Sequence, residues 1–292
     1  MTPTDFPDYF ADAESEITTA DFVLYGVPYE RYPSFRSGVA KAPLEIRKAS
    51  WNFETFDIRT AVDIKDIAVH DYGDLGVGNL DDNEMISLVE TFSSTLINKS
   101  KFPIAIGGSH SITPGIIQSF PRDTAVLFLD AHMDYRQSYE GSIYNHACAL
   151  RRVVDHVGVD NVAMLGVRSV EYEEYVNAKK DKIFYQDSFL IQKYGIKKSI
   201  EQTKQYLEGK KIYITLDSDV IDPSFAPATG TPEPYGLTPF DIVEVIEAFS
   251  SDIIGFDLVE VCPGFDFGET SILAAKIIRQ IIGLIWNKQY ND

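Results

Sequence analysis

The chain has 292 residues, of which 45% are hydrophobic and 24% charged, as expected of a folded protein with a sizeable core. Asp and Glu number 44 against 26 Lys and Arg, and the net charge of −18 argues against nucleic acid or a membrane as partner and favours a cationic small molecule. The acidic start "MTPTDFPDYFADAESE" lacks the features of a secretion signal, and no apolar run is long enough to span a bilayer. We therefore expect a cytoplasmic protein.

Short apolar runs alternate with segments of helical periodicity almost from end to end. The runs predict buried strands at 21–28, 67–73, 102–108, 124–130, 161–167, 211–217 and 252–261. The periodic segments predict helices at 83–99, 197–209, 238–251 and 271–288. This alternation is typical of a three-layer α/β fold, with a mainly parallel sheet and helices on both faces. Because no repeat or linker interrupts it, residues 1–292 are predicted to form a single domain.

Polar side chains follow four of the predicted strands at the point where each strand ends. They are Ser109-His110-Ser111, Asp130-Ala131-His132-Met133-Asp134, Asp217-Ser218-Asp219 and Glu260. If strand geometry continues through "FLDAHMDYR" (128–136), positions 130, 132 and 134 point to one side. Since ligands bind outside the carboxyl ends of parallel strands, we expect all four groups at one rim of the sheet.

This rim predicts a metal centre. The candidate ligands are His110, Asp130, His132, Asp134, Asp217 and Asp219. Four carboxylates and two imidazoles exceed the needs of one ion and fit two divalent ions bridged by carboxylates. Oxygen-rich ligation without sulfur favours Mn²⁺, with Fe, Co, Ni and Zn left open. Two such ions generate hydroxide near neutral pH, so the expected chemistry is hydrolysis. A purely structural role is disfavoured because buried, unpaired carboxylates repel one another.

Several segments carry a resemblance to a known family. "GGSHS" (107–111), "DAHMD" (130–134) and "LDSDVIDPSFAPATGTPEP" (216–234) resemble the signature motifs of the ureohydrolases, the arginase and agmatinase family. The similarity extends to "SFRSGVAKAPLEIRKAS" (34–50) and runs through nearly the whole chain. It implies an arginase-like α/β fold, two Mn²⁺ ions per subunit, and cleavage of a guanidino group to urea and an amine.

The resemblance also implies roles for single residues. Asp130 and Asp217 are the expected bridges between the ions. Our mechanistic hypothesis is that metal-bridging hydroxide attacks the guanidinium carbon and that the ions and Asp134 stabilise the tetrahedral intermediate. Glu260 is expected to anchor the substrate guanidinium. His146 stands at the position of the family's mobile histidine and is expected to pass a proton to the leaving amine. Its surroundings in the sequence are equally consistent with a surface histidine.

The substrate is predicted from the segment after "DAHMD". Arginases bind the α-amino and α-carboxylate groups of arginine with an Asn/Ser/Thr-rich segment there, whereas "YRQSYEGSIY" (135–144) resembles the agmatinase version. We therefore predict hydrolysis of agmatine to putrescine and urea, a reaction of polyamine biosynthesis. Arg136 keeps the alternatives open, because it could pair with the carboxylate of a guanidino acid, as in a guanidinobutyrase or an arginase.

Three positions depart from the usual family motifs. Ser109 replaces an acidic residue, Ala147-Cys148 follows His146 where Gly-Thr or Gly-Met is common, and Tyr235 replaces a glycine. A catalytically silent metal-binding relative is therefore the alternative from another class, but no ligand is missing and we expect activity. The resemblance further implies a homo-oligomer, a trimer or hexamer. The two cysteines, Cys148 and Cys262, are expected to be packing groups.

Overall fold

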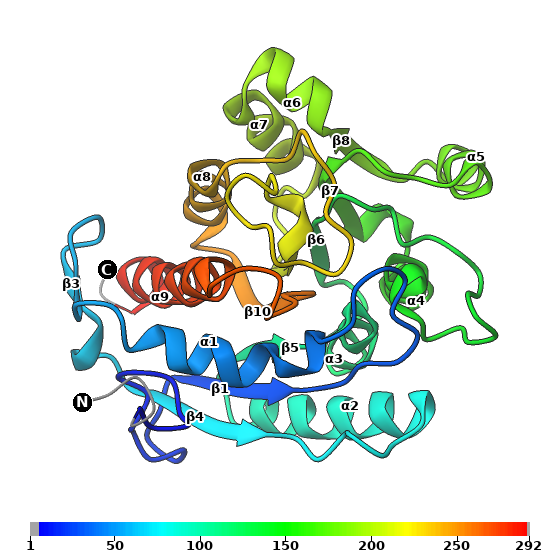
Figure 1. Cartoon of the computed structure of the whole chain (residues 1–292). Helices are drawn as coiled ribbons and strands as arrows, with labels where there is room; N and C mark the ends of the chain where they lie inside the picture. The colour runs from blue at the N-terminus through cyan, green and yellow to red at the C-terminus, as the bar shows by residue number, and fades with distance from the viewer. Residues whose placement is uncertain (1–5, 291–292) are drawn as a thin grey trace.

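The computed structural model describes residues 6–290, and its centre is an eight-stranded parallel sheet (Figure 1). The strands are β1 (Phe22–Val27), β4 (Val69–Asp74), β5 (Phe102–Gly107), β6 (Ala125–Leu129), β7 (Val162–Val167), β8 (Phe184–Asp187), β9 (Ile212–Asp217) and β10 (Ile253–Val259). Their order across the sheet is β4-β1-β5-β10-β9-β6-β7-β8, and every pairing is parallel. A separate antiparallel pair joins β2 (Phe56–Asp57) to β3 (Val62–Asp63).

Helices cover both faces of the sheet and so form the outer two of three layers (Figure 1). One face carries α1 (Ala42–Ser50), α6 (Ser188–Tyr194), α7 (Ile196–Tyr206), α8 (Pro239–Phe249) and α9 (Glu269–Gln289). The other carries α2 (Asp82–Asn98), α3 (Thr113–Ile117), α4 (Ala149–Val157) and α5 (Tyr172–Asp181). The predicted three-layer α/β fold is therefore confirmed.

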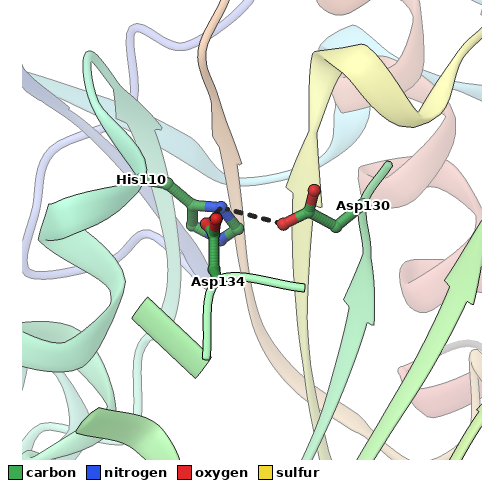
Figure 2. Close-up of side chains that lie close together, drawn as sticks. All are labelled: His110, Asp130 and Asp134. Atoms are coloured by element: carbon green, nitrogen blue, oxygen red, sulfur yellow. Dashed lines mark ion pairs between the residues drawn. The ribbon is translucent and has the colours of Figure 1, made fainter. Parts of the chain in front are cut away.

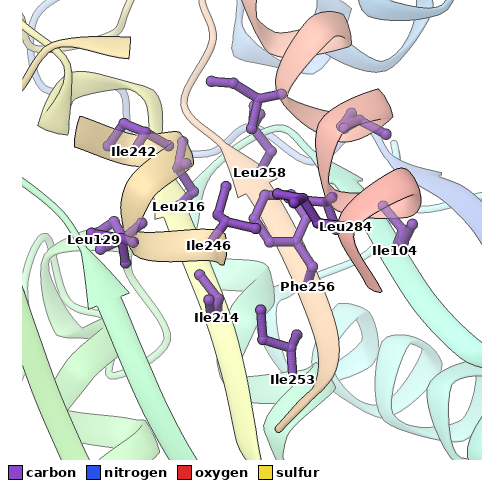
Figure 3. Packing of buried hydrophobic residues seen from close by; sticks show 14 of the residues in the cluster. Ile104, Leu129, Ile214, Leu216, Ile242, Ile246, Ile253, Phe256, Leu258 and Leu284 are labelled. Carbon is purple, nitrogen blue, oxygen red and sulfur yellow. The ribbon is translucent and has the colours of Figure 1, made fainter. Parts of the chain in front are cut away.

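Strand residues alternate between the two apolar layers. In β1, Phe22 and Leu24 belong to the cluster packed against α1 and α9, whereas Val23 and Tyr25 belong to the cluster packed against α2. Both faces are buried, which is why the strands read as nearly continuous apolar runs. Figure 3 shows the first layer at the centre of the sheet, where Phe256 and Leu258 of β10 lie beside Leu216 of β9, Ile246 of α8 and Leu284 of α9.

The predicted elements are observed with shifts of a few residues at their ends. Helices α2 and α8 begin at capping boxes, Asp81 with Glu84 and Thr238 with Asp241. The sequence analysis did not identify β8 or the short helices, whose periodic stretches are too brief to stand out. The single-domain organisation stays a prediction, supported by one sheet that takes strands from both ends of the chain. Within residues 6–290, every helix is too short or too polar to cross a bilayer.

Candidate metal centre

The candidate site lies at the carboxyl ends of the four central strands, β5, β10, β9 and β6. His110 opens a short 3-10 helix after β5, Asp130 follows β6, Asp217 ends β9 and Glu260 follows β10. Because these strands are neighbours and parallel, residues that are far apart in the sequence meet at one edge, as the sequence analysis predicted. His110, Asp217 and Glu260 line one cavity of about 410 Å³, together with His132 and Asp134 from the segment after β6.

The first part of the cluster surrounds the buried Nδ1 atom of His110. This atom lies 3.2 Å from Oδ2 of Asp130, 3.3 Å from Oδ2 of Asp134 and 3.4 Å from Oδ2 of Asp217. Figure 2 shows His110, Asp130 and Asp134 pointing toward one another from different segments. Nδ1 of His110 and Oδ2 of Asp130 are buried and make no hydrogen bond with any of residues 6–290. Buried polar atoms of this kind are costly unless a further group, such as a cation, satisfies them.

The second part of the cluster contains His132. Its Nδ1 lies 2.8 Å from Oδ2 of Asp219 and 3.9 Å from Oδ1 of Asp130. Ligand atoms from His110, Asp130 and Asp134 form one group of suitable size for a metal ion, and atoms from Asp130, His132 and Asp219 form another. Asp130 belongs to both, which is the arrangement that two neighbouring ions with a shared carboxylate require.

The route by which Asp134 reaches the cluster differs from the prediction. Strand β6 ends at Leu129, and Asp134 has a left-handed φ of 47°. The expectation that strand geometry continues through residues 128–136 is therefore wrong. The conformation of the loop after β6, and not the alternation of side chains along a strand, directs this carboxylate into the cluster. A non-glycine residue with positive φ is strained, and strain of this kind is concentrated at functional sites.

A buried hydrogen-bond chain fixes the protonation of the His110 ring. Thr215 donates its hydroxyl proton to Oδ1 of Asp257 at 2.5 Å, and its oxygen lies 3.0 Å from Nε2 of His110. Thr113 and Tyr213 also donate to Asp257, at 3.0 and 2.9 Å. Since Thr215 donates its single hydroxyl proton to Asp257, its oxygen accepts a hydrogen bond from the Nε2–H group of His110. When the ring is neutral, the lone pair of Nδ1 then faces the three carboxylates, as a metal ligand requires.

The electrostatics of the cluster attract positive charge. Burial, reinforced by the neighbouring charge of Asp130, raises the pKa of Asp134 to about 7. Burial and the charges of Asp219 and Asp130 raise the pKa of Asp217 well above its usual value. Burial opposes protonation of His110, yet the surrounding carboxylates raise its pKa well above the ordinary histidine value. Oxygen and imidazole donors with unpaired charge therefore fit a pair of divalent cations.

Glu260 stands beside the cluster in a fixed position. Its φ is 62°, its backbone N–H donates to Gly108 at 2.8 Å, and its Oε1 accepts from the backbone N–H of His110 at 2.7 Å. Its Oε2 accepts no hydrogen bond from residues 6–290. Burial raises the pKa of this carboxyl to about 7. One oxygen is thus held by the protein, and the other is available to a ligand in the cavity.

His146 and Arg136 lie on the wall of the same cavity. Nε2 of His146 lies 2.8 Å from the hydroxyl of Ser34. Burial, with the nearby positive charges of His110, His132 and Arg136, lowers the pKa of His146 to about 4, so its ring is neutral near pH 7.

The double glycine of "GGSHS" is required by close backbone contacts. A Cβ at Gly107 would lie 2.6 Å from Cγ1 of Val259, and one at Gly108 only 2.2 Å from the carbonyl oxygen of Tyr29. Ser109 is buried, and its hydroxyl accepts from the N–H of Ser111, so the serine caps the short helix that presents the neighbouring histidine.

The departure at Tyr235 has a local explanation. Tyr235 has a φ of 68°, a conformation that glycine adopts without strain, which explains why a glycine is common there. Cys148 and Cys262 are buried, and burial raises their thiol pKa values to about 12 and about 11, so both stay protonated.

The sequence analysis did not single out several residues that line or support the site. Glu30, Ser34 and Glu174 line the cavity. Ser34 lies on a loop and Glu174 on helix α5, and the sequence around each of them carries no local signal of a functional site. Asp257 carried one, because an acidic residue inside the apolar run "IIGFDLV" calls for a partner.

The comparison with known families is unambiguous. The arginase family model matches residues 20–283. The agmatinase of Bacillus anthracis is 30% identical over 286 residues, covering 96% of both chains. The N(1)-aminopropylagmatine ureohydrolase of Thermococcus kodakarensis is 35% identical over 269 residues, covering 90% of both.

The solved structures agree with this assignment. The agmatine ureohydrolase of Thermoplasma volcanium is 38% identical, superimposes with a TM-score of 0.93, and covers 97% of this chain and 96% of its own. The resemblance seen in the motifs is therefore confirmed. The chain belongs to the arginase family of ureohydrolases.

Proposed function

We propose that the protein hydrolyses agmatine to putrescine and urea at a centre of two manganese ions. The observation that carries this choice of substrate is the environment of Arg136. Its Nε lies 3.3 Å from Oε2 of the buried Glu174, and its guanidinium lies 4.5 Å from the ring centre of Tyr139. An arginine that is already neutralised attracts a substrate carboxylate little, so a guanidino compound without a carboxylate is favoured over a guanidino acid.

The other two arginines of the cavity wall are also engaged. Nη1 of Arg31 lies 3.7 Å from Asp82, and Nη1 of Arg36 donates to the carbonyl oxygens of Pro227 and Thr229. No arginine of the cavity therefore has its guanidinium without a partner among residues 6–290. This supports agmatine over L-arginine and 4-guanidinobutyrate.

The metal ions would be held by the six residues of the cluster. The donors are His110, Asp130, His132, Asp134, Asp217 and Asp219. Two divalent ions supply an activated water near neutral pH and polarise the group that it attacks. The oxygen-rich donor set without sulfur favours manganese.

The chain's own residues would bind and orient the substrate. Glu260 accepts a hydrogen bond from the guanidinium through its free Oε2, and its charge holds the planar group in one orientation. His146, neutral and on the cavity wall, accepts a proton at one ring nitrogen as it releases one from the other, and so delivers a proton to the leaving amine. Asp134 faces the same space and stabilises positive charge there.

A longer cationic substrate is the second candidate. The relative from Thermococcus kodakarensis, named for aminopropylagmatine, is 35% identical, against 30% for the Bacillus anthracis agmatinase. The exposed Glu171 lies at the cavity wall, where it could accept an additional amine. A guanidino-acid hydrolase and a silent metal-binding relative remain the weaker alternatives. Cytoplasmic location and a homo-oligomeric state stay predictions.

The test is urea release by the manganese-reconstituted protein with agmatine, N1-aminopropylagmatine, L-arginine and 4-guanidinobutyrate. We expect the highest kcat/KM with one of the two substrates that lack a carboxylate. Asp130→Asn should lose both bound metal and activity, whereas the matched control Asp123→Asn, at an exposed acid before the same strand, should keep both. Preference for a carboxylate-bearing substrate would contradict the inference that Arg136 does not attract a substrate carboxylate. Absence of urea release from all four substrates would indicate a catalytically silent relative.

A further inference from the structure

Ser34 makes the sole side-chain hydrogen bond that the described residues offer to the ring of His146. The two atoms, Oγ of Ser34 and Nε2 of His146, lie 2.8 Å apart and come from segments 112 residues apart in the sequence. Both side chains line the cavity that contains the metal cluster.

The backbone of His146 is already fixed, so the ring orientation is the remaining freedom. His146 opens a short 3-10 helix that Asn145 caps by accepting from the N–H of Ala147 at 3.1 Å, and Asn145 is buried. With the backbone held, the side chain can still rotate about two torsions. The Ser34 hydroxyl restrains these torsions at the far end of the ring, and Tyr139 packs against the ring edge-on at 6.0 Å.

The segment that carries Ser34 is itself held on both sides. Oε1 of Glu30 accepts from the N–H of Gly38 at 2.7 Å, which closes the loop around residues 30–38. Arg36 donates its backbone N–H to Gly230 at 3.2 Å and its guanidinium to Pro227 at 2.7 Å. Ser34 is therefore presented from a pinned loop, although its side chain is exposed. A residue that orients a catalytic side chain must itself be held in a fixed position, and this loop provides that.

We propose that Ser34 is a positioning residue, whose hydroxyl holds the imidazole of His146 in the orientation needed for proton transfer. This inference rests on the proposed function, which gives His146 the transfer of a proton to the leaving amine. A neutral imidazole does this only when one defined nitrogen faces the amine and the other faces a proton source. By engaging Nε2, Ser34 fixes the direction in which each ring nitrogen points.

The experiment compares variants of the manganese-loaded, full-length protein with agmatine as substrate. Ser34→Ala should lower kcat about ten-fold or more, part of what an acid–base group contributes, with little change in KM. Ser34→Thr, which keeps a hydroxyl, should restore most of kcat. The matched control is Ser37→Ala, since Ser37 is exposed on the same loop and makes no side-chain hydrogen bond with residues 6–290. This control should behave like the wild type.

A double-mutant cycle shows whether Ser34 acts through His146. In a His146→Asn background, Ser34→Ala should cause little further loss, because the group that it orients is already absent. Equal losses in both backgrounds, or a kcat for Ser34→Ala equal to that of Ser37→Ala, would overturn the inference while leaving the proposed function intact. Failure of the wild type to release urea from any guanidino substrate would instead reject the proposed function, and the role of Ser34 with it.

Discussion

A β-carbon on Gly230 would lie 3.0 Å from Oε2 of Glu260, the carboxylate oxygen that faces the cavity. Gly230 also donates its backbone N–H to the carbonyl oxygen of Glu260 at 3.2 Å, so the two residues are fixed against each other. The other carboxylate oxygen of Glu260 is held by the N–H of His110 at 2.7 Å. The absence of a side chain at Gly230 thus leaves the space in which a guanidinium would meet Glu260.

Gly230→Ala should weaken substrate recognition without unfolding the protein. The new methyl group must push the Glu260 carboxylate aside by a few tenths of an ångström, and small displacements at a reacting centre cost about ten-fold or more in kcat/KM. We expect this lower kcat/KM to come mainly from a higher KM for agmatine, measured by urea release. Gly76→Ala is the control, because a Cβ at Gly76 meets no atom of residues 6–290 within 4 Å. Equal kinetics in the two variants would show that Glu260 does not contact the substrate.

Thr215→Val should reduce metal affinity. The valine cannot accept the Nε2 proton of His110 or donate to Asp257, so the ring loses the partner that fixes its tautomer. Loss of such a partner typically costs about 10- to 100-fold in metal affinity. Manganese dissociation constants from competition with a chelator would measure this. Thr203→Val provides the comparison. Thr203 is equally buried, and among residues 6–290 its hydroxyl bonds only to Ser199 of α7, so the manganese affinity of this variant should match the wild type.

Glu174→Gln should shift specificity toward guanidino acids. Removing this charge leaves Arg136 without its ion-pair partner at the cavity wall and free to attract a substrate carboxylate. We expect kcat/KM for 4-guanidinobutyrate to rise about ten-fold relative to agmatine, a gain within the range of a charge-assisted hydrogen bond. The adjacent Glu173 is exposed and its side chain makes no hydrogen bond or ion pair with residues 6–290, so Glu173→Gln should keep the wild-type ratio. Adding Arg136→Gln should abolish the shift, and an unchanged ratio in Glu174→Gln would remove Arg136 from substrate selection.

Much of this architecture could be predicted from the sequence because the central strands are buried on both faces. Runs such as 102–108 and 212–216 are almost entirely apolar, and polar residues follow at once where each strand reaches the edge of the sheet. A change from apolar to acidic residues at a strand end is a local signal. It correctly placed His110, Asp130 and Asp217 together.

The supporting contacts could not be predicted because they join segments with no local signal. Ser34 and His146 meet across 112 residues, and the pairing of Glu174 with Arg136 depends on how α5 packs beside the loop after β6. The positive φ of Asp134 likewise results from tertiary structure. The sequence analysis therefore grouped Asp134 correctly with the other acidic residues, but its reason, a strand that continues past Leu129, was wrong. Sequence patterns indicate which residues are buried and whether a segment has helix or strand periodicity, whereas these contacts depend on the conformation of loops.

The metal-free protein should become less stable as the pH rises. The folded-state pKa values of Asp134 and Glu260 are raised to about 7, so below that range the folded chain binds protons that the unfolded chain, with ordinary carboxyl pKa values, has released. Stability is therefore highest at low pH with respect to these two groups, and it is lost between the unfolded pKa and about pH 7. We expect the Tm of chelator-treated protein to fall between about pH 5 and about pH 8. Saturating Mn²⁺ should remove this trend, because the cations hold the carboxylates in their ionised form and stabilise the fold that binds them. A metal-free Tm that rises over this range would show that the cluster does not carry the unpaired charge described above.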